Sequence, residues 1–111
     1  MAVETKTLAP ETLAEHERVI RIIRAHEADL RALGVARLWL FGSIARGKAG
    51  PKSDVDVMIA IPTGRKFSLF DLGEVRVELC ELLGREVDVV IEEDLRPAFR
   101  RDIASDLIGV L

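Results

Sequence analysis

Three stretches of the chain repeat apolar residues at the spacing of an amphipathic helix. The first covers residues 12–33 and stops before Gly34, which suits a helix C-cap, so one long helix is expected there. The second begins after Ser68, a suitable N-cap, and stops at Gly84. The third starts near Pro97. The apolar positions of this last predicted helix are Phe99, Ile103, Leu107 and Val110.

Three shorter apolar runs, at residues 35–41, 54–61 and 87–91, have the length and composition of buried strands. A short helix is expected between the first two, after Gly42. The connection 42–53 is short for a parallel crossover, so the first two strands should be antiparallel. The helix between the second and third strands suits a right-handed parallel crossover. The element order predicts an α/β (α+β) fold, a small mixed three-stranded core sheet flanked by about four helices.

Two aspartates, Asp54 and Asp56, stand at the mouth of the second predicted strand. Asp is depleted in strands, and a buried carboxylate is costly unless it is paired or bound to a metal. Residues two apart on a strand point to the same face, so the two carboxylates should lie side by side. Mg²⁺ takes carboxylate oxygens and keeps positions open for substrate phosphates, so a phosphate-transfer site is expected here.

Gly42 and Ser43 directly follow the first predicted strand. Glycine lets the backbone approach a ligand closely, and Ser43 at a helix start offers amide groups and a hydroxyl to phosphate oxygens. The alternative is purely structural: Ser43 caps the short helix, and Asp54 forms an Asx turn after Gly50 and Pro51. The Gly-Ser pair taken together with the strand aspartates favours the functional interpretation.

The string Gly-Ser-Ile-Ala-Arg-Gly at 42–47, followed by Ser-Asp-Val-Asp-Val at 53–57, resembles the signature of the DNA polymerase beta superfamily of nucleotidyltransferases. It is similar in particular to the minimal nucleotidyltransferases, small proteins often paired with HEPN-domain toxins. The resemblance implies a third acid on a later strand, and Asp88 within residues 87–91 stands at the matching place. If the third strand is parallel to the second, Asp88 falls beside Asp54.

The resemblance also implies a Mg²⁺-dependent nucleotidyltransferase with ATP as its substrate. The catalytic and metal-binding residues would be Asp54, Asp56 and Asp88. They would hold two Mg²⁺ ions, which stabilise both ends of the in-line displacement at the α-phosphate of ATP. Asp88 could accept the proton of the nucleophile. The nucleotide-binding residues would be Gly42, Ser43 and Arg46. Arg46 could meet a β- or γ-phosphate, although a solvated loop charge is an equally good interpretation.

The length of 111 residues indicates a single domain over residues 1–111, with residues 1–9 frayed, and the resemblance implies that it is a nucleotidyltransferase domain. Hydrophobic residues make up 49% of the chain and charged residues 32%, which is a globular balance. The net charge of -3, with both signs interleaved, argues against direct binding to nucleic acid or to an anionic membrane. Cys80 is the lone cysteine, and no apolar run approaches the roughly 20 residues that span a bilayer. A cytoplasmic location is therefore expected.

Three functions stay open from the sequence. The resemblance favours an antitoxin that transfers AMP from ATP onto a Tyr of a HEPN ribonuclease toxin within a hetero-oligomer. The others are a small-molecule nucleotidyltransferase of the aminoglycoside type and a non-catalytic antitoxin that acts by binding, which would not need buried acids that cost stability. A protein acceptor would require an apolar surface, for which Phe67, Phe70 and residues 107–111 are candidates. The alternative is that these residues close the core.

Overall fold

The computed structural model describes residues 10–50 and 52–111, so the segment expected to be frayed, 1–9, lies outside the described residues. The helices are α1 (Pro10–Ala25), α2 (Glu27–Ala32), α3 (Gly42–Ala45), α4 (Leu69–Leu83) and α5 (Pro97–Ile103). The strands are β1 (Arg37–Phe41), β2 (Val55–Ala60), β3 (Val87–Ile91) and β4 (Ile108–Gly109). Two 3₁₀ turns, η2 (Glu92–Asp94) and η3 (Ala104–Asp106), flank α5. The predicted α/β class is confirmed, and one strand more than predicted is present.

The strands form one mixed sheet in the order β3-β2-β1-β4. β1 and β2 are antiparallel, and β2 and β3 are parallel with α4 as the connection between them. Both strand orientations agree with the prediction. The arrangement brings the end of β1, the start of β2 and the start of β3 to the same end of the sheet.

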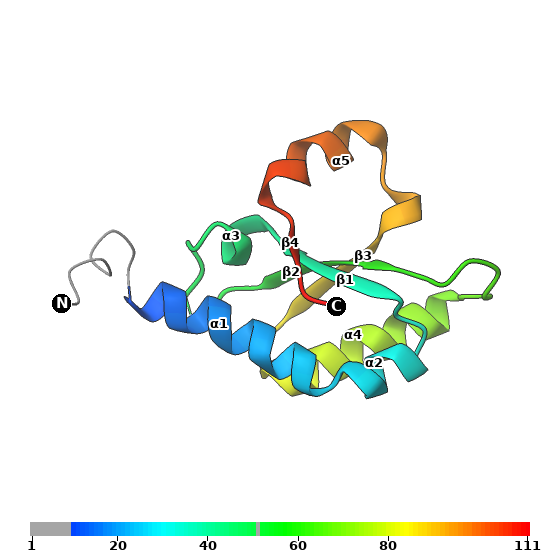
Figure 1. Ribbon diagram of the computed structural model, residues 1–111, viewed down its shortest axis with the longest axis horizontal. Helices are drawn as coiled ribbons and strands as arrows, with labels where there is room; N and C mark the ends of the chain where they lie inside the picture. The colour runs from blue at the N-terminus through cyan, green and yellow to red at the C-terminus, as the bar shows by residue number, and fades with distance from the viewer. Residues whose placement is uncertain (1–9, 51) are drawn as a thin grey trace.

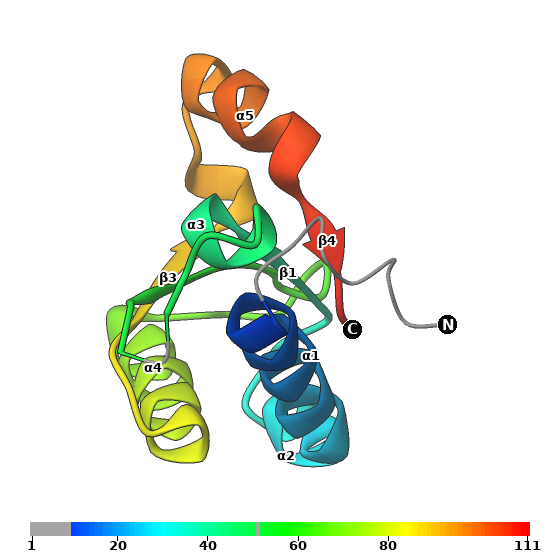
Figure 2. The same cartoon turned by 90° about the vertical axis from the view of Figure 1, so that its left-hand side faces the viewer.

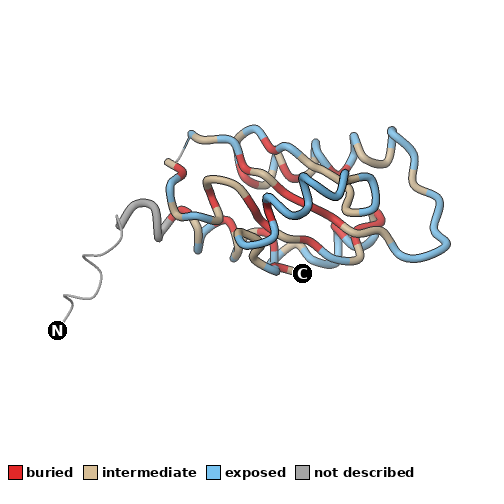
Figure 3. The backbone as a smooth tube through the Cα atoms, turned by 90° about the horizontal axis from the view of Figure 1, so that it is seen from above, coloured by how far each residue is buried: buried red, intermediate tan, exposed pale blue. Residues whose placement is uncertain are grey.

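Helices cover the two faces of the sheet unequally. Figure 1 and Figure 2 show α1, α2 and α4 together on one face and α5 alone on the other. The larger face carries the main core, in which Val19, Leu40 and Leu79 are fully buried. On the α5 face a smaller cluster joins Phe41 and Met58 to Ile103 of α5. In Figure 3 the buried stretches run through the strands, while long parts of the helices and loops are exposed.

The sequence predicted one helix over residues 12–33, but the structure contains two, α1 and α2, separated at His26. His26 has φ -114° and ψ 24°, which are not helical values. Its ring Nδ1 lies 2.9 Å from the carbonyl oxygen of Ile22, and its backbone N–H donates to Ile23 instead. The imidazole thus takes the carbonyl that a continuous helix would use for its backbone bond. The spacing of apolar residues does not reveal that the His26 ring replaces a backbone N–H at this carbonyl, so it could not predict the break.

The prediction that the last helix extends through Leu107 and Val110 was wrong. α5 stops at Ile103, and the chain continues through η3 into β4, which pairs antiparallel with β1. The N–H of Val110 donates to the Leu38 carbonyl at 2.8 Å, and Val110 is buried. An open β1 edge offers unpaired backbone groups, so pairing with the last residues satisfies them. The sheet therefore has four strands rather than three.

Helix α4 begins and ends where the sequence predicts. Ser68 is its N-cap and forms a capping box with Asp71, and Gly84 follows in the left-handed conformation with φ 67°. Cys80, on this helix, is half-buried against the main core, as expected for a small core residue. In the part of the chain that the structure describes, no helix combines the length and apolar character required to cross a membrane.

Candidate active site

Asp56 and Asp88 occupy neighbouring positions on the parallel strands β2 and β3. The register sets Asp56 opposite Asp88, and on the other side β1 sets Phe41 opposite Asp56. Side chains directly opposite each other project to the same face of a sheet, so the two carboxylates stand side by side. The sequence predicted Asp54 as the neighbour of Asp88, and the register corrects that partner to Asp56.

Asp54 immediately precedes β2 and is exposed, while Asp56 inside the strand is half-buried. The position of Asp54, two residues before Asp56, puts both on one side of an extended chain. The negative charges of Asp88 and Asp54 both act on the Asp56 carboxylate. The three predicted acids therefore belong to one electrostatic neighbourhood at the end of the sheet.

Asp56 has a pKa raised above its ordinary value of 3.8. Burial of the carboxyl is the largest cause, because a low-dielectric environment disfavours the charged form. The charges of Asp88 and then Asp54 raise the pKa further, and the Arg46 guanidinium opposes them by lowering it. The ionised carboxylate is therefore held at a cost, which a bound cation would relieve.

The carboxylate donors at this site suit Mg²⁺, which keeps open coordination positions, better than a structural metal ion that protein ligands enclose completely. Among residues 10–50 and 52–111, no three His, Cys, Asp or Glu side chains form a group that could already hold a metal. Mg²⁺ does not need such a cage, since one or two carboxylates bind it and waters and substrate phosphates complete its shell. Two carboxylates in register, one with a raised pKa, fit an ion that arrives with a nucleotide.

Gly42 has a geometric reason to be glycine. It has φ 73°, in the region that side chains rarely adopt, and it directly follows β1. A Cβ atom at this position would collide with the carboxylate of Asp56. The start of α3 can approach Asp56 closely only because residue 42 lacks a side chain.

The first turn of α3 faces the site without a side-chain cap. The N-cap is Phe41, with extended backbone, and it makes no side-chain capping bond. Ser43 is therefore not the cap that the structural alternative required, and its carbonyl accepts the Lys48 N–H at 2.8 Å. The first amides of a helix have no partner within the helix, so those of Gly42 and Ser43 can serve a phosphate.

Arg46, the C-cap of α3, forms an ion pair with Asp106 of η3 at 2.9 Å. Its side chain is half-exposed, and its charge reaches Asp56. It therefore lies near the predicted acids, while its contact with a phosphate stays a prediction. Of the arginines on α5, Arg100 pairs with Glu92 at 3.1 Å.

Two buried charged residues were missed by the sequence analysis. Arg85 and Glu15 pair with each other although they are 70 positions apart, and their side chains are only 3% and 8% exposed. Arg85 also donates to the carbonyls of Gly50 and Ser53, just before Asp54. Apolar periodicity contains no signal for such a pair. The sequence feature that could have drawn attention to Arg85 is its position directly after Gly84, the residue that ends α4.

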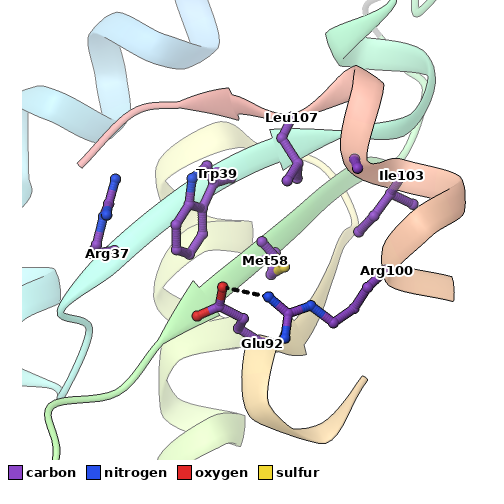
Figure 4. A pocket seen from close by; sticks show the side chains of 8 residues that line it. Arg37, Trp39, Met58, Glu92, Arg100, Ile103 and Leu107 are labelled. Carbon is purple, nitrogen blue, oxygen red and sulfur yellow. Dashed lines mark hydrogen bonds and ion pairs between the residues drawn. The ribbon is translucent and has the colours of Figure 1, made fainter. Parts of the chain in front are cut away.

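A cavity of about 330 Å³ lies on the α5 face of the sheet (Figure 4). The Arg37 guanidinium stacks over the Trp39 ring at 4.9 Å, and Glu92 and Arg100 approach from the other side. Met58, Ile103 and Leu107 supply apolar walls. None of the predicted site residues lines this cavity, so it is a separate feature from the carboxylates.

Comparison with known proteins identifies the family. Residues 14–110 match the family model described as the nucleotidyltransferase domain. A provisionally assigned protein adenylyltransferase of Methanocaldococcus jannaschii is 37% identical over 78 residues, which cover 70% of this chain and 82% of the relative. The protein adenylyltransferase MntA of Thermococcus cleftensis is 33% identical over 98 residues, covering 85% of this chain and 94% of the relative.

Solved structures agree with these relatives. A structure provisionally described as a minimal nucleotidyltransferase is 34% identical, covers 86% of this chain and 88% of its own, and has a TM-score of 0.61. A chain from the complex of a tri-AMPylated HEPN toxin with an MNT antitoxin, from Shewanella oneidensis, is 14% identical with a TM-score of 0.57. It covers 90% of this chain and 71% of that chain, and at this identity it shows the shared fold alone. The chain belongs to the nucleotidyltransferase domain family, in its minimal nucleotidyltransferase branch, and is an enzyme of that family.

Proposed function

We propose that this enzyme transfers AMP from ATP onto a Tyr of a HEPN-type toxin and so acts as an antitoxin. The observation that carries the proposal is the pair of carboxylates in register, Asp56 and Asp88, with Gly42 packed against the first. A protein acceptor is supported by the MntA relative, named as a protein adenylyltransferase, and by the shared fold with a chain from an MNT–HEPN complex. A cytoplasmic location stays a prediction.

Asp54, Asp56 and Asp88 would hold Mg²⁺, two ions being expected, and the metal would neutralise phosphate charge during the transfer. Gly42 lets the start of α3 pack against the Asp56 carboxylate, because it has no Cβ to collide with it, so the first amides of α3 would lie beside phosphates bound there. Arg46 can offer its guanidinium to a β- or γ-phosphate by exchanging its partner Asp106 for the nucleotide.

In the proposed reaction the acceptor hydroxyl oxygen forms a bond to the α-phosphorus of ATP. The bond between that phosphorus and the bridging oxygen breaks, and pyrophosphate leaves. The hydroxyl proton passes to the carboxylate of Asp88. Asp88 suits this role because it is exposed at the start of β3, where an acceptor can reach it, whereas Asp56 beside it is half-buried.

A partner surface is available on α4. Leu69 and Phe70 are 84% and 86% exposed, and they border a groove of about 520 Å³. Glu74 and Glu78 also line this groove, so a partner with an apolar side chain flanked by basic residues would complement it. We call the surface formed by Leu33, Leu69, Phe70, Gly73 and Val77 the α4 patch.

The other candidate partner segments do not form such a surface. Phe67 is half-buried and packs against the main core. Residues 107–111 were expected to end the chain as a helix that could dock outward, but they enter the sheet through β4 and bury Val110. Among the predicted candidates, Phe70 is the one apolar side chain in the exposed class, so the docking prediction now rests on α4.

The proposal is tested by incubating the purified protein with Mg²⁺, ATP and the HEPN protein encoded beside its gene, followed by intact-mass spectrometry. We expect the partner to gain the mass of one or more AMP units, and peptide mapping to place them on Tyr. Asp56→Asn should abolish the addition. Asp102→Asn, which removes an exposed acid from α5, is the matched control and should leave it unchanged.

The rival functions give different results in the same experiment. A stable complex without any added mass would contradict transfer and indicate an antitoxin that acts by binding. Neither complex nor added mass would direct attention to a small-molecule acceptor, such as an aminoglycoside.

A further inference from the structure

Arg85 lies in the turn between α4 and β3 and is almost fully enclosed by acceptors. Its Nε donates to the Ser53 carbonyl at 2.8 Å and its Nη2 to the Gly50 carbonyl at 2.6 Å. Its Nη1 donates to the carboxylate of Glu15 in α1. One guanidinium thus joins the first helix and the turn before β3 to the loop that precedes β2.

Stability alone does not explain this buried pair. Burial lowers the pKa of Arg85, which reflects the cost of desolvating the guanidinium. Buried ion pairs can often be replaced by apolar side chains without loss of stability, whereas removing one partner alone is strongly destabilising. Glu15 therefore acts as the counter-ion that allows the Arg85 guanidinium to be buried. The role of the guanidinium is then to hold the carbonyls of Gly50 and Ser53.

Those carbonyls belong to the short loop that leads to Asp54. Gly50 and Ser53 also bond to each other: the Gly50 N–H donates to the Ser53 hydroxyl at 2.9 Å, and the Ser53 N–H to the Gly50 carbonyl at 3.2 Å. The peptide bond between Ser53 and Asp54 contains one of the two carbonyls that Arg85 holds. Among the described residues, the exposed carboxylate of Asp54 has no hydrogen-bond partner of its own, so its position depends on this backbone.

We infer that Arg85, with Glu15 as its counter-ion, is a positioning residue that fixes Gly50 and Ser53 and thereby sets Asp54 against Asp56 for binding Mg²⁺–ATP. The inference rests on the proposed function for its ligand. Lysine cannot replace the residue, because a single ammonium lacks the planar fork that reaches two carbonyls and a carboxylate together.

Three variants separate positioning from folding. Arg85→Lys keeps the positive charge beside Glu15 and loses the fork. The double variant Glu15→Met, Arg85→Met removes both charges and so leaves neither one buried alone. The control is Arg76→Met with Glu86→Met, which removes an exposed ion pair of 2.6 Å between α4 and the turn that contains Arg85, without touching the loop carbonyls.

Two measurements are made on each variant and on the wild-type protein. The first is hydrogen exchange at the Gly50 and Ser53 amides without ligand, and the second is the concentration of Mg²⁺–ATP that gives half of the maximal thermal shift. Loss of a residue that orients metal ligands typically weakens metal binding by about 10–100-fold. In both Arg85 variants we expect about tenfold faster exchange at these amides and at least a tenfold higher half-saturating concentration. The control pair should change neither.

A residue with a merely structural role would lower the melting temperature and leave both readouts unchanged, and that result would overturn the inference. The two proposals also fail separately. If the wild-type protein shows no Mg²⁺–ATP shift, the proposed function and the ligand in this inference are both wrong. The exchange data then still decide whether Arg85 fixes the loop, because they require no ligand.

Discussion

Asp56 is the residue at which the packing and the electrostatics of the site meet. It pairs with Phe41 on one side and Asp88 on the other, and Gly42 must lack a side chain to make room for it. Its raised pKa shows that the folded protein holds the ionised form at a cost. A folded protein that keeps a destabilising carboxylate at position 56 is expected to need its negative charge for function.

We predict that Asp56→Asn stabilises the protein in the absence of metal and nucleotide. The folded-state pKa of Asp56 lies above its ordinary value of 3.8, so the folded state binds this proton more tightly than the unfolded state does. Wild-type stability is therefore lost as the pH rises through the folded-state pKa, while the neutral Asn is unaffected. Thermal unfolding should show a higher melting temperature for the variant at neutral pH, and a smaller difference as the pH falls towards about 4.

Asp102→Asn provides the comparison for this experiment, because Asp102 is an exposed acid on α5 and is not among the charges that raise the pKa of Asp56. A similar gain in both variants would point to a general effect of net charge and contradict the account of Asp56. Added Mg²⁺ should reduce the advantage of Asp56→Asn, since the ion stabilises only a site that can bind it.

A second residue-scale prediction concerns Gly42→Ala. The substitution combines a strained backbone, at φ 73°, with a Cβ that collides with the Asp56 carboxylate. The left-handed conformation alone costs a non-glycine residue roughly 1–2 kcal/mol. We expect Gly42→Ala to lose more stability than that in chemical denaturation and to lose the Mg²⁺–ATP thermal shift.

Gly84→Ala is the matched control, because Gly84 has φ 67° and no atom within 4 Å of an added Cβ. It should show the backbone cost and keep the full Mg²⁺–ATP shift. Equal losses in the two alanine variants would mean that close approach to Asp56 is not what requires glycine at position 42.

The sequence was informative about residues whose type conflicts with their surroundings. Aspartates in a β-strand and a glycine at the end of one are unusual enough to indicate a site. Arg85 and Glu15 gave no such signal, because their contacts are to distant backbone and to each other across 70 positions. Pairings of this kind depend on the folded topology, which residue spacing does not specify.

At the scale of elements, the interior of each helix and strand was easier to predict than its ends. Both capping residues of α4 were identified because Ser68 and Gly84 act through local backbone geometry. The break at His26 and the strand β4 were missed, since each depends on a hydrogen bond that replaces the one an uninterrupted helix would make. Periodicity of apolar residues describes which face is buried, and both helices and short strands can satisfy it.

The terminal strand leads to a prediction about Val110. Val110 directly follows β4, is only 5% exposed, and donates its N–H to the Leu38 carbonyl, so truncation should remove buried contacts. At about 0.8 kcal/mol for each buried methylene-sized group, Val110→Ala should cost roughly 1–3 kcal/mol in urea unfolding. Gly109→Ala, at an exposed neighbour whose Cβ would make only ordinary contact with Trp39, should cost much less. A negligible effect of Val110→Ala would contradict its place in the sheet.

On the scale of the whole molecule, the sheet separates the end that carries Asp56 and Asp88 from the α4 patch. β2 runs from the carboxylates towards the start of α4, so the exposed Leu69 and Phe70 lie near the opposite end of the sheet (Figure 1). A protein that uses both places must be large enough to extend along the enzyme. This separation suits a folded protein acceptor better than a small molecule.

The separation also predicts how a change in the patch alters the kinetics. Phe70→Ser removes an exposed aromatic side chain of the kind that dominates binding at protein interfaces, where truncation costs about 2 kcal/mol or more at central positions. Because Phe70 is remote from Asp56, we expect the KM for the partner protein to rise at least about tenfold while kcat stays near the wild-type value. The Mg²⁺–ATP thermal shift should also be unchanged, which would show that the fold and the nucleotide site are intact.

Glu81→Gln, on the exposed side of the same helix and outside the groove, is the control. An unchanged KM in Phe70→Ser would exclude the α4 patch as the docking surface, and an equal fall in kcat would mean that the patch communicates with the carboxylates across the sheet.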